Sequence, residues 1–502
     1  MEFRIECPFL IKYPTILYLT LLFLGESGIA QSLPNINPNE IDHLVLSAMQ
    51  NWHIPGCAIV ITSGEEIIFT QGYGYRNVED KLLITPRTVF KIASCTKSFT
   101  AAAAGLLVNK RLLEWDKPLK DYLPDLKLHS EYLTAQVTLR DCLSHRTGLY
   151  DDDWAWVGDH IDSNRLYEII EAMPVRYPFR TNYQYSNVMY ALVGSLLTKF
   201  SHNSWRELIR NNFFVPLSME SACFSHNQTS GLNDFAYGYE YNEQMNRYVR
   251  GNLNEHFTDS LSVCESFGFI SASVTDLAKW VQTFISGGKY KSKIIIPGEI
   301  LNEVLKPHNF ISLPEYPELS ESYYTLGWIQ NYYKGHKLLQ HSGGLSGFKS
   351  YMSFMPGDSL GIVVLTNGQP YQFPQALTFD LYDRVLGFYK TNWLQRHQIK
   401  IIQEIPDSSS SEKYPGTKPN KPLHEYAGIY HSKWLGNMVV IYYQGELYFQ
   451  FHQYPPEKMT HAHFETFFTS EFKGPENGIT FLFTHNGEIT GLMLNEFKFD
   501  KK

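Results

Sequence analysis

The order of apolar patterns along the chain limits its fold more than any other feature. An amphipathic helix is predicted for residues 41–53, and two strands follow at 58–62 and 67–71. The chain then reads mainly as helix until strands return beyond about residue 323, before a last helix at 374–388. The later strands are predicted at residues 338–341, 351–354 and 361–366. This order predicts an α+β fold in which both ends of one domain contribute strands to the same sheet.

A second, smaller domain is predicted after a linker. Residues 404–422 contain four Pro and four Ser among mixed charges, a composition that cannot form a core. Residues 423–502 then alternate between apolar and polar side chains, with hairpin turns at Gln444-Gly445 and Asn486-Gly487. This pattern predicts a small antiparallel β-domain, barrel-like in form.

The N-terminus resembles a secretory signal peptide over residues 1–30. Lys12 precedes the apolar run 16–25, and the small residues Gly28 and Ala30 fit a cleavage site. The run is shorter than the roughly 20 residues that span a bilayer. We therefore expect a secreted or periplasmic protein whose mature domain covers 31–403, with no transmembrane segment after cleavage. An uncleaved N-terminal anchor is the alternative.

Composition excludes several classes of protein. Aromatic residues make up 15% of the chain and apolar residues 43%, which excludes a disordered chain. The net charge is −8 and no basic stripe is present, which argues against nucleic-acid binding. The six cysteines form no CxxC pair, so their spacing predicts neither a zinc site nor a disulfide framework.

Ser94 and Lys97 are the first candidates for chemistry. Residues three apart on a helix share a face, and apolar neighbours around Lys97 would disfavour its charged form. A neutral amine there can take the proton of a serine nucleophile. The SxxK pattern occurs five times, but only at Ser94 does it open a long apolar helix. A serine that merely caps this helix is the alternative interpretation.

Two further segments favour the nucleophile. Tyr185-Ser186-Asn187 stands at the start of another apolar helix, so polar groups again gather at a helix end. His341-Ser342-Gly343-Gly344 follows a predicted strand.

In this order and spacing, the three segments resemble the serine β-lactamase and penicillin-binding-protein superfamily, and most closely its class C branch. Residues 143–149 (LSHRTGL) and 268–280 (GFISASVTDLAKW) are also similar to segments of that branch, and the likeness covers about residues 38–395. It implies a DD-peptidase-like antiparallel sheet flanked by helices, with a helical subdomain. The C-terminal segment resembles the lipocalin-like domain often appended to these hydrolases.

The resemblance also implies a role for each matching position. Ser94 would attack a carbonyl and form an acyl-enzyme, while Lys97 and Tyr185 move its proton to the leaving group. Asn187 would form a hydrogen bond with Lys97 or with an amide group of the substrate. The backbone N–H groups of Ser94 and Gly344, beside Gly343, would form the oxyanion hole. No metal and no organic cofactor is implied, and the partner is a small-molecule or peptide substrate.

His341 departs from the lysine that usually begins the third motif. A histidine is mostly neutral at pH 7, so it holds a substrate carboxylate less well. We therefore expect amide or ester hydrolysis on peptide, D-aminoacyl or peptidoglycan-derived substrates. A β-lactamase or DD-peptidase, and a non-catalytic binding homologue, are the alternatives. Trp154, beside the acidic residues 151–153, is a candidate for contact with a cationic or aromatic end of the substrate. The alternative is that Trp154 only packs within a solvated loop.

Overall fold

The computed structural model describes residues 36–155, 161–224, 232–251, 263, 265–404, 416–452, 455–469 and 478–502. The predicted signal peptide, residues 1–30, lies outside the described residues, as do residues 405–415 of the predicted linker. Among the helices that are described, none is both long enough and apolar enough to cross a membrane.

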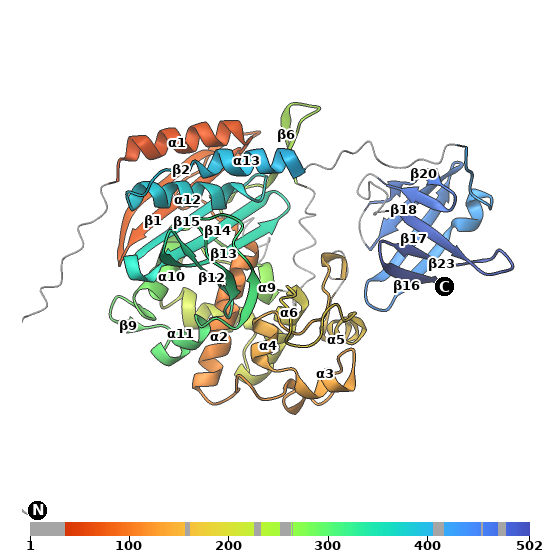
Figure 1. Cartoon of the computed structure of the whole chain (residues 1–502), viewed down its shortest axis with the longest axis horizontal. Helices are drawn as coiled ribbons and strands as arrows, with labels where there is room; N and C mark the ends of the chain where they lie inside the picture. Colours follow the sequence, from red (N-terminus) through yellow and green to blue (C-terminus); the bar gives the residue numbers. More distant parts are fainter. Residues whose placement is uncertain are drawn as a thin grey trace, which may run out of the picture. The chain divides into compact units, whose positions relative to one another are not determined.

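The core of the larger domain is a sheet of nine antiparallel strands (Figure 1). Their order is β10 (Asn309–Ser312), β11 (Ser322–Tyr324), β12 (Ile329–Tyr333), β13 (His336–Leu345), β14 (Phe348–Met355), β15 (Leu360–Thr366), β1 (Gly56–Ser63), β2 (Glu66–Asn77) and β3 (Leu82–Leu83). β1 pairs with β15, so that Val60 lies opposite Val363. The early and late strands therefore share one sheet, which confirms the prediction from the order of apolar patterns.

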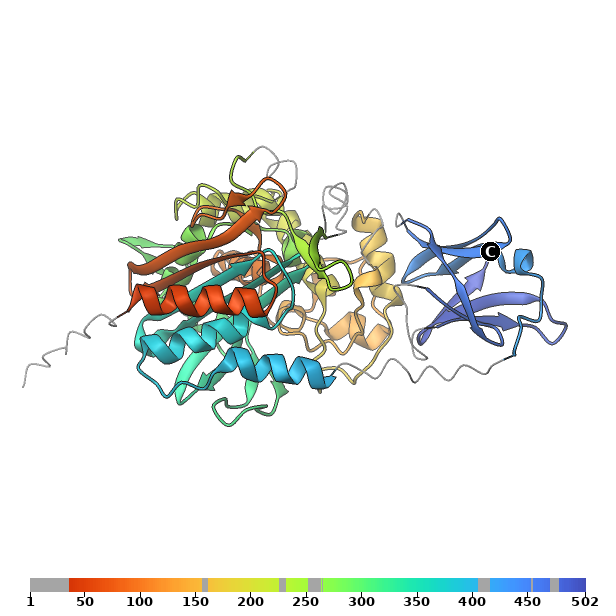
Figure 2. The same ribbon diagram turned by 90° about the horizontal axis from the view of Figure 1, so that it is seen from above.

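Helices cover both faces of this sheet, as the alternation of apolar side chains requires. The helices of the larger domain are α1 (Pro38–Asn51), α2 (Lys97–Asn109), α3 (Glu131–Gln136), α4 (Leu139–Leu143), α5 (Ser163–Ala172), α6 (Asn187–Ser201), α7 (Trp205–Ile209), α9 (Glu265–Gly268), α10 (Val274–Ile285), α11 (Gly298–Val304), α12 (Phe373–Val385) and α13 (Trp393–Glu404). Ile59 and Ile362 face the layer of α1 and α12, while Val60 and Val363 face α10. Figure 2 shows α1, α12 and α13 side by side over the face of the sheet on which Ile59 and Ile362 lie.

The helices α3 to α6 gather away from the sheet as a helical subdomain (Figure 1). α2 contacts both α6 of this group and α11, and nearly all of its residues are buried. Its Phe99 stacks on Trp280 of α10, with ring centroids 4.0 Å apart. A helix that is apolar on all sides is stable only inside a protein, which explains the run of four alanines at 101–104.

The start of α2 differs from the prediction. The helix begins at Lys97, and Ser94 lies in the preceding 3-10 turn, Ala93–Thr96. The Ser94 side chain caps neither element. Ala93 has a φ of +47°, a left-handed conformation that is unusual for a residue with a side chain. The chain therefore turns sharply before Ser94 and leaves its hydroxyl partly exposed, while Lys97 is buried.

The C-terminal strands form a second antiparallel sheet. Their order is β19 (Glu457–Lys458), β18 (Glu446–Phe451), β17 (Gly436–Tyr443), β16 (Gly428–Ser432), β24 (Phe497–Lys501), β23 (Ile489–Leu494), β22 (Ile479–Phe483), β21 (Thr466–Phe468) and β20 (Thr460–His463). Gln444 and Gly445 both have positive φ, which is the geometry of a two-residue hairpin turn. The predicted antiparallel β-structure is confirmed.

Candidate active site

Ser94 and Lys97 lie together, as their spacing predicts. Lys97 Nζ is 3.1 Å from Ser94 Oγ, and Lys97 is fully buried. The ammonium form is poorly solvated in this position, and burial lowers the pKa of Lys97 to about 7, although Asp153 and Asp151 act in the opposite direction. A large fraction of Lys97 is thus a neutral amine near neutral pH.

The hydrogen bonds of Lys97 orient this amine. Lys97 Nζ donates to Asn187 Oδ1 at 2.6 Å and to the carbonyl oxygen of Phe267 at 2.9 Å. A neutral amine has two N–H groups and one lone pair. Because both N–H groups are bound by carbonyl oxygens, the lone pair is left for the Ser94 hydroxyl. This is the geometry of a general base beside a nucleophile.

Tyr185 and Asn187 are placed by the start of α6. Ser186 between them is the N-cap residue, and its Oγ accepts a hydrogen bond from Met189 N at 3.2 Å. Asp151 adds a second cap, because its Oδ2 accepts from Ser186 Oγ at 3.0 Å and from Val188 N at 2.8 Å. The side chains on either side of the cap therefore project from a fixed backbone.

Tyr185 closes the site above Lys97. Its ring centroid is 4.8 Å from Lys97 Nζ. Burial raises the pKa of its hydroxyl well above the usual value, against a smaller lowering by a hydrogen bond with the Ser94 side chain. Tyr185 is consequently a phenol at neutral pH, able to donate a proton but unsuited to act as a base. The base is Lys97.

His341 on β13 has both ring nitrogens engaged. Nδ1 lies 2.6 Å from the carbonyl oxygen of Ser342, and Nε2 lies 3.0 Å from the hydroxyl of Tyr324. A carbonyl only accepts, so Nδ1 carries the proton and Nε2 accepts from Tyr324. Burial lowers the pKa of His341 to about 3, so the ring is neutral. This position therefore provides no positive charge for a substrate carboxylate.

Gly343 lets β13 approach the turn that carries Ser94. A side chain at Gly343 would collide with Ser350 Oγ and with the carbonyl oxygen of Ile92, two atoms that are themselves hydrogen-bonded at 2.7 Å. Cys95 Sγ donates to the carbonyl oxygen of His341 at 3.2 Å. The turn Ala93–Thr96, which carries Ser94, is thereby fixed against β13 and β14.

On the opposite side of β13, Tyr371 packs against Gly344. A Cβ at Gly344 would lie 2.8 Å from the Tyr371 ring. The Tyr371 hydroxyl is 2.5 Å from Ser342 Oγ, and the side chain is 49% exposed. We expect this aromatic ring to border the bound substrate.

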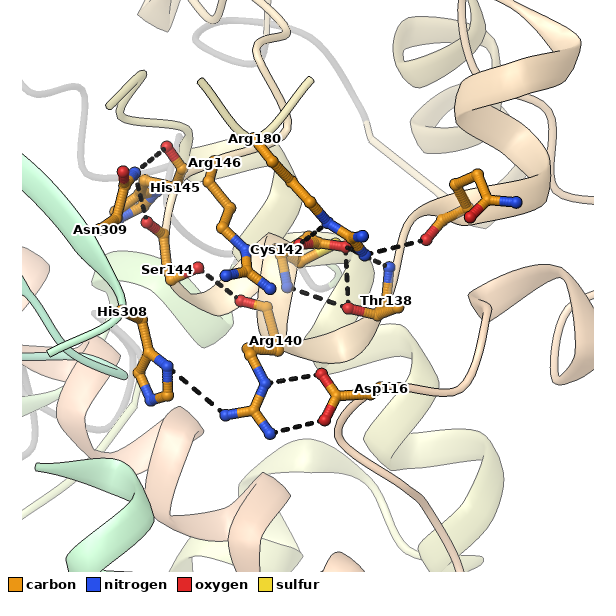
Figure 3. Close-up of polar contacts among 12 residues, drawn as sticks. Asp116, Thr138, Arg140, Cys142, Ser144, His145, Arg146, Arg180, His308 and Asn309 are labelled. Atoms are coloured by element: carbon orange, nitrogen blue, oxygen red, sulfur yellow. Dashed lines mark hydrogen bonds and ion pairs between the residues drawn. The ribbon is translucent and has the colours of Figure 1, made fainter. Parts of the chain in front are cut away.

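The loop at residues 143–149 contacts the start of α6 and is itself held by Asn309, whose contacts with Ser144 and His145 are drawn in Figure 3. His145 Nδ1 accepts a hydrogen bond from Ser186 N at 3.0 Å, and burial lowers the pKa of His145 well below its usual value. Asn309 Nδ2 donates to the carbonyl oxygens of Ser144 and His145, each at 3.1 Å. His145 has a φ of +56°, and these contacts hold it in that conformation. The motif that resembles the family therefore acts as a support here.

The acidic stretch 151–153 acts mainly within the protein. Asp151 caps α6, and Asp153 Oδ1 accepts a hydrogen bond from Asn187 Nδ2 at 3.1 Å. The backbone of Trp154 lies in the 3-10 turn Asp153–Ala155, while its side chain is outside what the structure describes. Substrate contact by Trp154 therefore stays a prediction.

Sequence reasoning missed Tyr324, Tyr371 and the carbonyl of Phe267 as supporting groups, and it singled out Asp151 and Asp153 only for contact with substrate. Phe267 directly precedes the segment 268–280, which resembles a segment of the family. The tyrosines gave no signal, because 33 occur in the chain. In the described part of the chain, no three His, Cys, Asp or Glu side chains gather as a metal site.

Comparison with known proteins agrees with this arrangement. The sequence model of the Beta-lactamase family matches residues 41–385, and that of a domain of unknown function, DUF3471, matches residues 412–502. An unguisins hydrolase of Aspergillus campestris is 27% identical over 414 residues, covering 77% of this chain and 74% of that protein. Protein flp of Staphylococcus aureus is 26% identical over 67% of this chain and 64% of that protein.

Solved structures show the same fold. The octameric penicillin-binding protein homologue from Pyrococcus abyssi superimposes with a TM-score of 0.63 at 21% identity, over 93% of this chain and all of that one. The D-amino acid amidase of Ochrobactrum anthropi gives 0.55 at 20% identity, over 73% of this chain and 99% of that one. Because the family model matches well over half of the chain, this protein belongs to the Beta-lactamase family.

Proposed function

We propose that the chain is a serine hydrolase that cleaves an amide or ester bond through an acyl-enzyme on Ser94. The observation that carries the proposal is the contact of 3.1 Å between Lys97 Nζ and Ser94 Oγ, with both N–H groups of a neutral Lys97 bound by carbonyl oxygens. An amine held in this way can accept only the serine proton.

The reaction follows from these groups. Ser94 Oγ forms a bond to the substrate carbonyl carbon while its proton passes to Lys97. The resulting oxyanion lies at the backbone N–H groups of Ser94 and Gly344. Collapse breaks the bond to the leaving group, which takes a proton through the Tyr185 hydroxyl. Water then attacks the acyl-enzyme with Lys97 as base, and Ser94 is restored.

The proposed substrate lacks a carboxylate next to the scissile bond. His341 is neutral and both of its nitrogens are bound, so no charge stands where the family's usual lysine would be. Peptide, D-aminoacyl and peptidoglycan-derived amides with a neutral or blocked end fit this site. The names of the relatives, an unguisins hydrolase and a D-amino acid amidase, support an amide as the bond cleaved.

Mass spectrometry of covalent adducts tests the proposal. The protein is treated separately with a fluorophosphonate and with a fluorescent penicillin, and the modified peptide is identified after proteolysis. We expect the fluorophosphonate on Ser94 and turnover of p-nitrophenyl esters. Penicillin on Ser94 would favour a β-lactamase or DD-peptidase. Absence of both adducts, together with no ester turnover, would favour a binding homologue.

The rate should depend on pH through Lys97. Because its amine must be unprotonated to act as base, and its pKa is about 7, kcat/KM should rise with pH and level off above about 8. The measurement is kcat/KM for p-nitrophenyl butyrate between pH 5 and pH 9. A rate that is flat from pH 5 to pH 8 contradicts Lys97 as the base.

Replacing His341 by lysine should change substrate preference. His341→Lys places an ammonium group where a carboxylate could bind, so kcat/KM for a substrate with a carboxylate beside the scissile bond should rise about tenfold relative to its methyl ester. The measurement is the ratio of the two kcat/KM values in both proteins.

Lys349 provides the control for this comparison. Its Nζ lies 3.3 Å from where a Gly344 Cβ would stand, on the same side as Tyr371, and burial lowers its pKa to about 8. In Lys349→Met, the ratio of kcat/KM for the carboxylate substrate to that for its methyl ester should equal the ratio of the wild type. The proposal of a substrate without a carboxylate is wrong if the wild type has the higher kcat/KM for the carboxylate substrate and Lys349→Met loses this preference.

A further inference from the structure

The amide of Asn187 stands between the proposed base and an acidic residue. Its Oδ1 accepts from Lys97 Nζ at 2.6 Å, while its Nδ2 donates to Asp153 Oδ1 at 3.1 Å. Asp153 lies in the turn Asp153–Ala155 and Asn187 begins α6, so the two come from separate parts of the helical subdomain. The order Asp153, Asn187, Lys97, Ser94 is a continuous chain of hydrogen bonds.

The orientation of the Asn187 amide matters for the lone pair of Lys97. An amide can turn about its last side-chain bond and exchange its oxygen and nitrogen. In the turned state, the NH₂ group of Asn187 would face Lys97 and bind the lone pair that Ser94 requires. An ionised carboxylate is only an acceptor, so Asp153 favours the state in which the NH₂ group faces away from Lys97.

We propose that Asp153 is a positioning residue that fixes the Asn187 amide and so reserves the lone pair of Lys97 for Ser94. This inference rests on the proposed function. It assigns Asp153 no contact with the reacting atoms, and it gives the acidic stretch a role other than binding a cationic substrate.

Asp153 also acts on Lys97 through its charge. Several titratable or charged groups surround Lys97: Asp151 and Asp153 from the acidic loop, Cys95 from the turn that carries Ser94, His145 from the supporting loop, His341 from β13, and Tyr185 and Tyr190 from the start of α6. Burial lowers the pKa of Lys97, and the charge of Asp153 is the largest of the effects that raise it. Removing this charge should therefore lower the pKa of Lys97.

Three variants at residue 153 and one control test the inference. Asp153→Ala removes the acceptor and the charge, Asp153→Asn removes the charge with little change in shape, and Asp153→Glu restores a carboxylate. Asp152→Asn is the matched control, since it removes a charge one residue away and Asp152 accepts from the Tyr150 hydroxyl at 3.4 Å. Thermal melting checks that each variant is folded.

The first readout is kcat/KM for p-nitrophenyl butyrate, a neutral ester, from pH 5 to pH 9. For Asp153→Ala we expect a fall of about tenfold at the plateau, since one hydrogen bond to a charged group is lost. For both Asp153→Ala and Asp153→Asn the rising limb should move to lower pH by about half a unit to one unit. In Asp153→Glu the rising part of the kcat/KM profile should lie within about 0.3 pH unit of its position in the wild type. Asp152→Asn should leave that position unchanged.

The second readout does not require turnover. Protein labelled with ¹³C at lysine Cε is titrated by NMR, with the Lys97 signal assigned by its absence in Lys97→Met. A lower Lys97 pKa in Asp153→Asn, but not in Asp152→Asn, supports the inference even if the ester is not hydrolysed, in which case the proposed function alone fails.

Two results would overturn the inference. One is that the wild type is active but Asp153→Asn changes neither the pKa of Lys97 nor the pH at which kcat/KM rises. The other is a rise in KM limited to esters with a free ammonium group, with kcat and the pH limb unchanged, since this would make Asp153 a substrate-binding residue.

Discussion

Ser94→Ala should lower kcat/KM for p-nitrophenyl butyrate by about 10⁴- to 10⁶-fold, the loss typical when a serine nucleophile is removed. It should also abolish covalent labelling by a fluorophosphonate. The physical reason is that, among the described residues, Ser94 has the one hydroxyl that is hydrogen-bonded to Lys97 Nζ, whose other bonds lead to Asn187 and the Phe267 carbonyl. Both measurements are made at pH 8, where Lys97 is mostly neutral.

We expect Ser94→Ala to keep the fold, because the Ser94 side chain caps neither its own turn nor α2. The melting temperature should therefore stay within about 2 °C of the wild type, since such substitutions usually change stability little. Ser286→Ala is a suitable control, as Ser286 begins another SxxK segment in the sequence. Activity of Ser94→Ala within tenfold of the wild type would disprove the acyl-enzyme.

Lys97→Met should abolish most activity and yet stabilise the protein. The rate should fall about 10³-fold or more, because general-base assistance and the orientation of Ser94 are both lost. Methionine nearly preserves the shape of the lysine stem, so the packing of α2 is retained. The rising pH limb of kcat/KM should also disappear from any remaining activity.

The gain in stability follows from the pKa of Lys97. In the folded protein it is about 7, against 10.5 for an unperturbed lysine, so between these pH values the unfolded chain holds a proton that the folded protein does not. The unfolding free energy of the wild type therefore rises with pH across this range. Burial of Lys97 costs roughly 5 kcal/mol at pH 7 and below, and nothing above pH 10.5.

Denaturant unfolding at two pH values measures this effect. The three contacts of Lys97 offset part of the burial cost, so we expect Lys97→Met to be more stable by about 2 kcal/mol at pH 7. The difference should shrink by pH 10. Lys110→Met, at the exposed end of α2, is the control and should change neither activity nor stability. The argument is wrong if the free energy of unfolding of Lys97→Met, relative to that of the wild type, is lower at pH 7 than at pH 10.

The first and last elements of the larger domain could be predicted because their patterns are local. Strands β1, β14 and β15 alternate or run apolar within a few residues, and the helices that flank them carry apolar faces. The strands β10 to β12 were harder to predict because they are short and carry polar residues such as Asn309 and Gln330. Each of them pairs with the next strand along the chain, β10 with β11, β11 with β12 and β12 with β13, so the position of the outer strands depends on the strands inside them.

The sequence by itself determined the fold class, the antiparallel C-terminal strands and the set of candidate residues Ser94, Lys97, Tyr185, Asn187 and His341, because their motifs are short and ordered along the chain. Only the tertiary structure decided what those residues meet. Burial makes His341 neutral, Tyr324 from another strand is hydrogen-bonded to its Nε2, and the Asn187 amide donates to Asp153 from another loop. Protonation and hydrogen-bond direction depend on burial and on partners distant in sequence, which no local pattern contains.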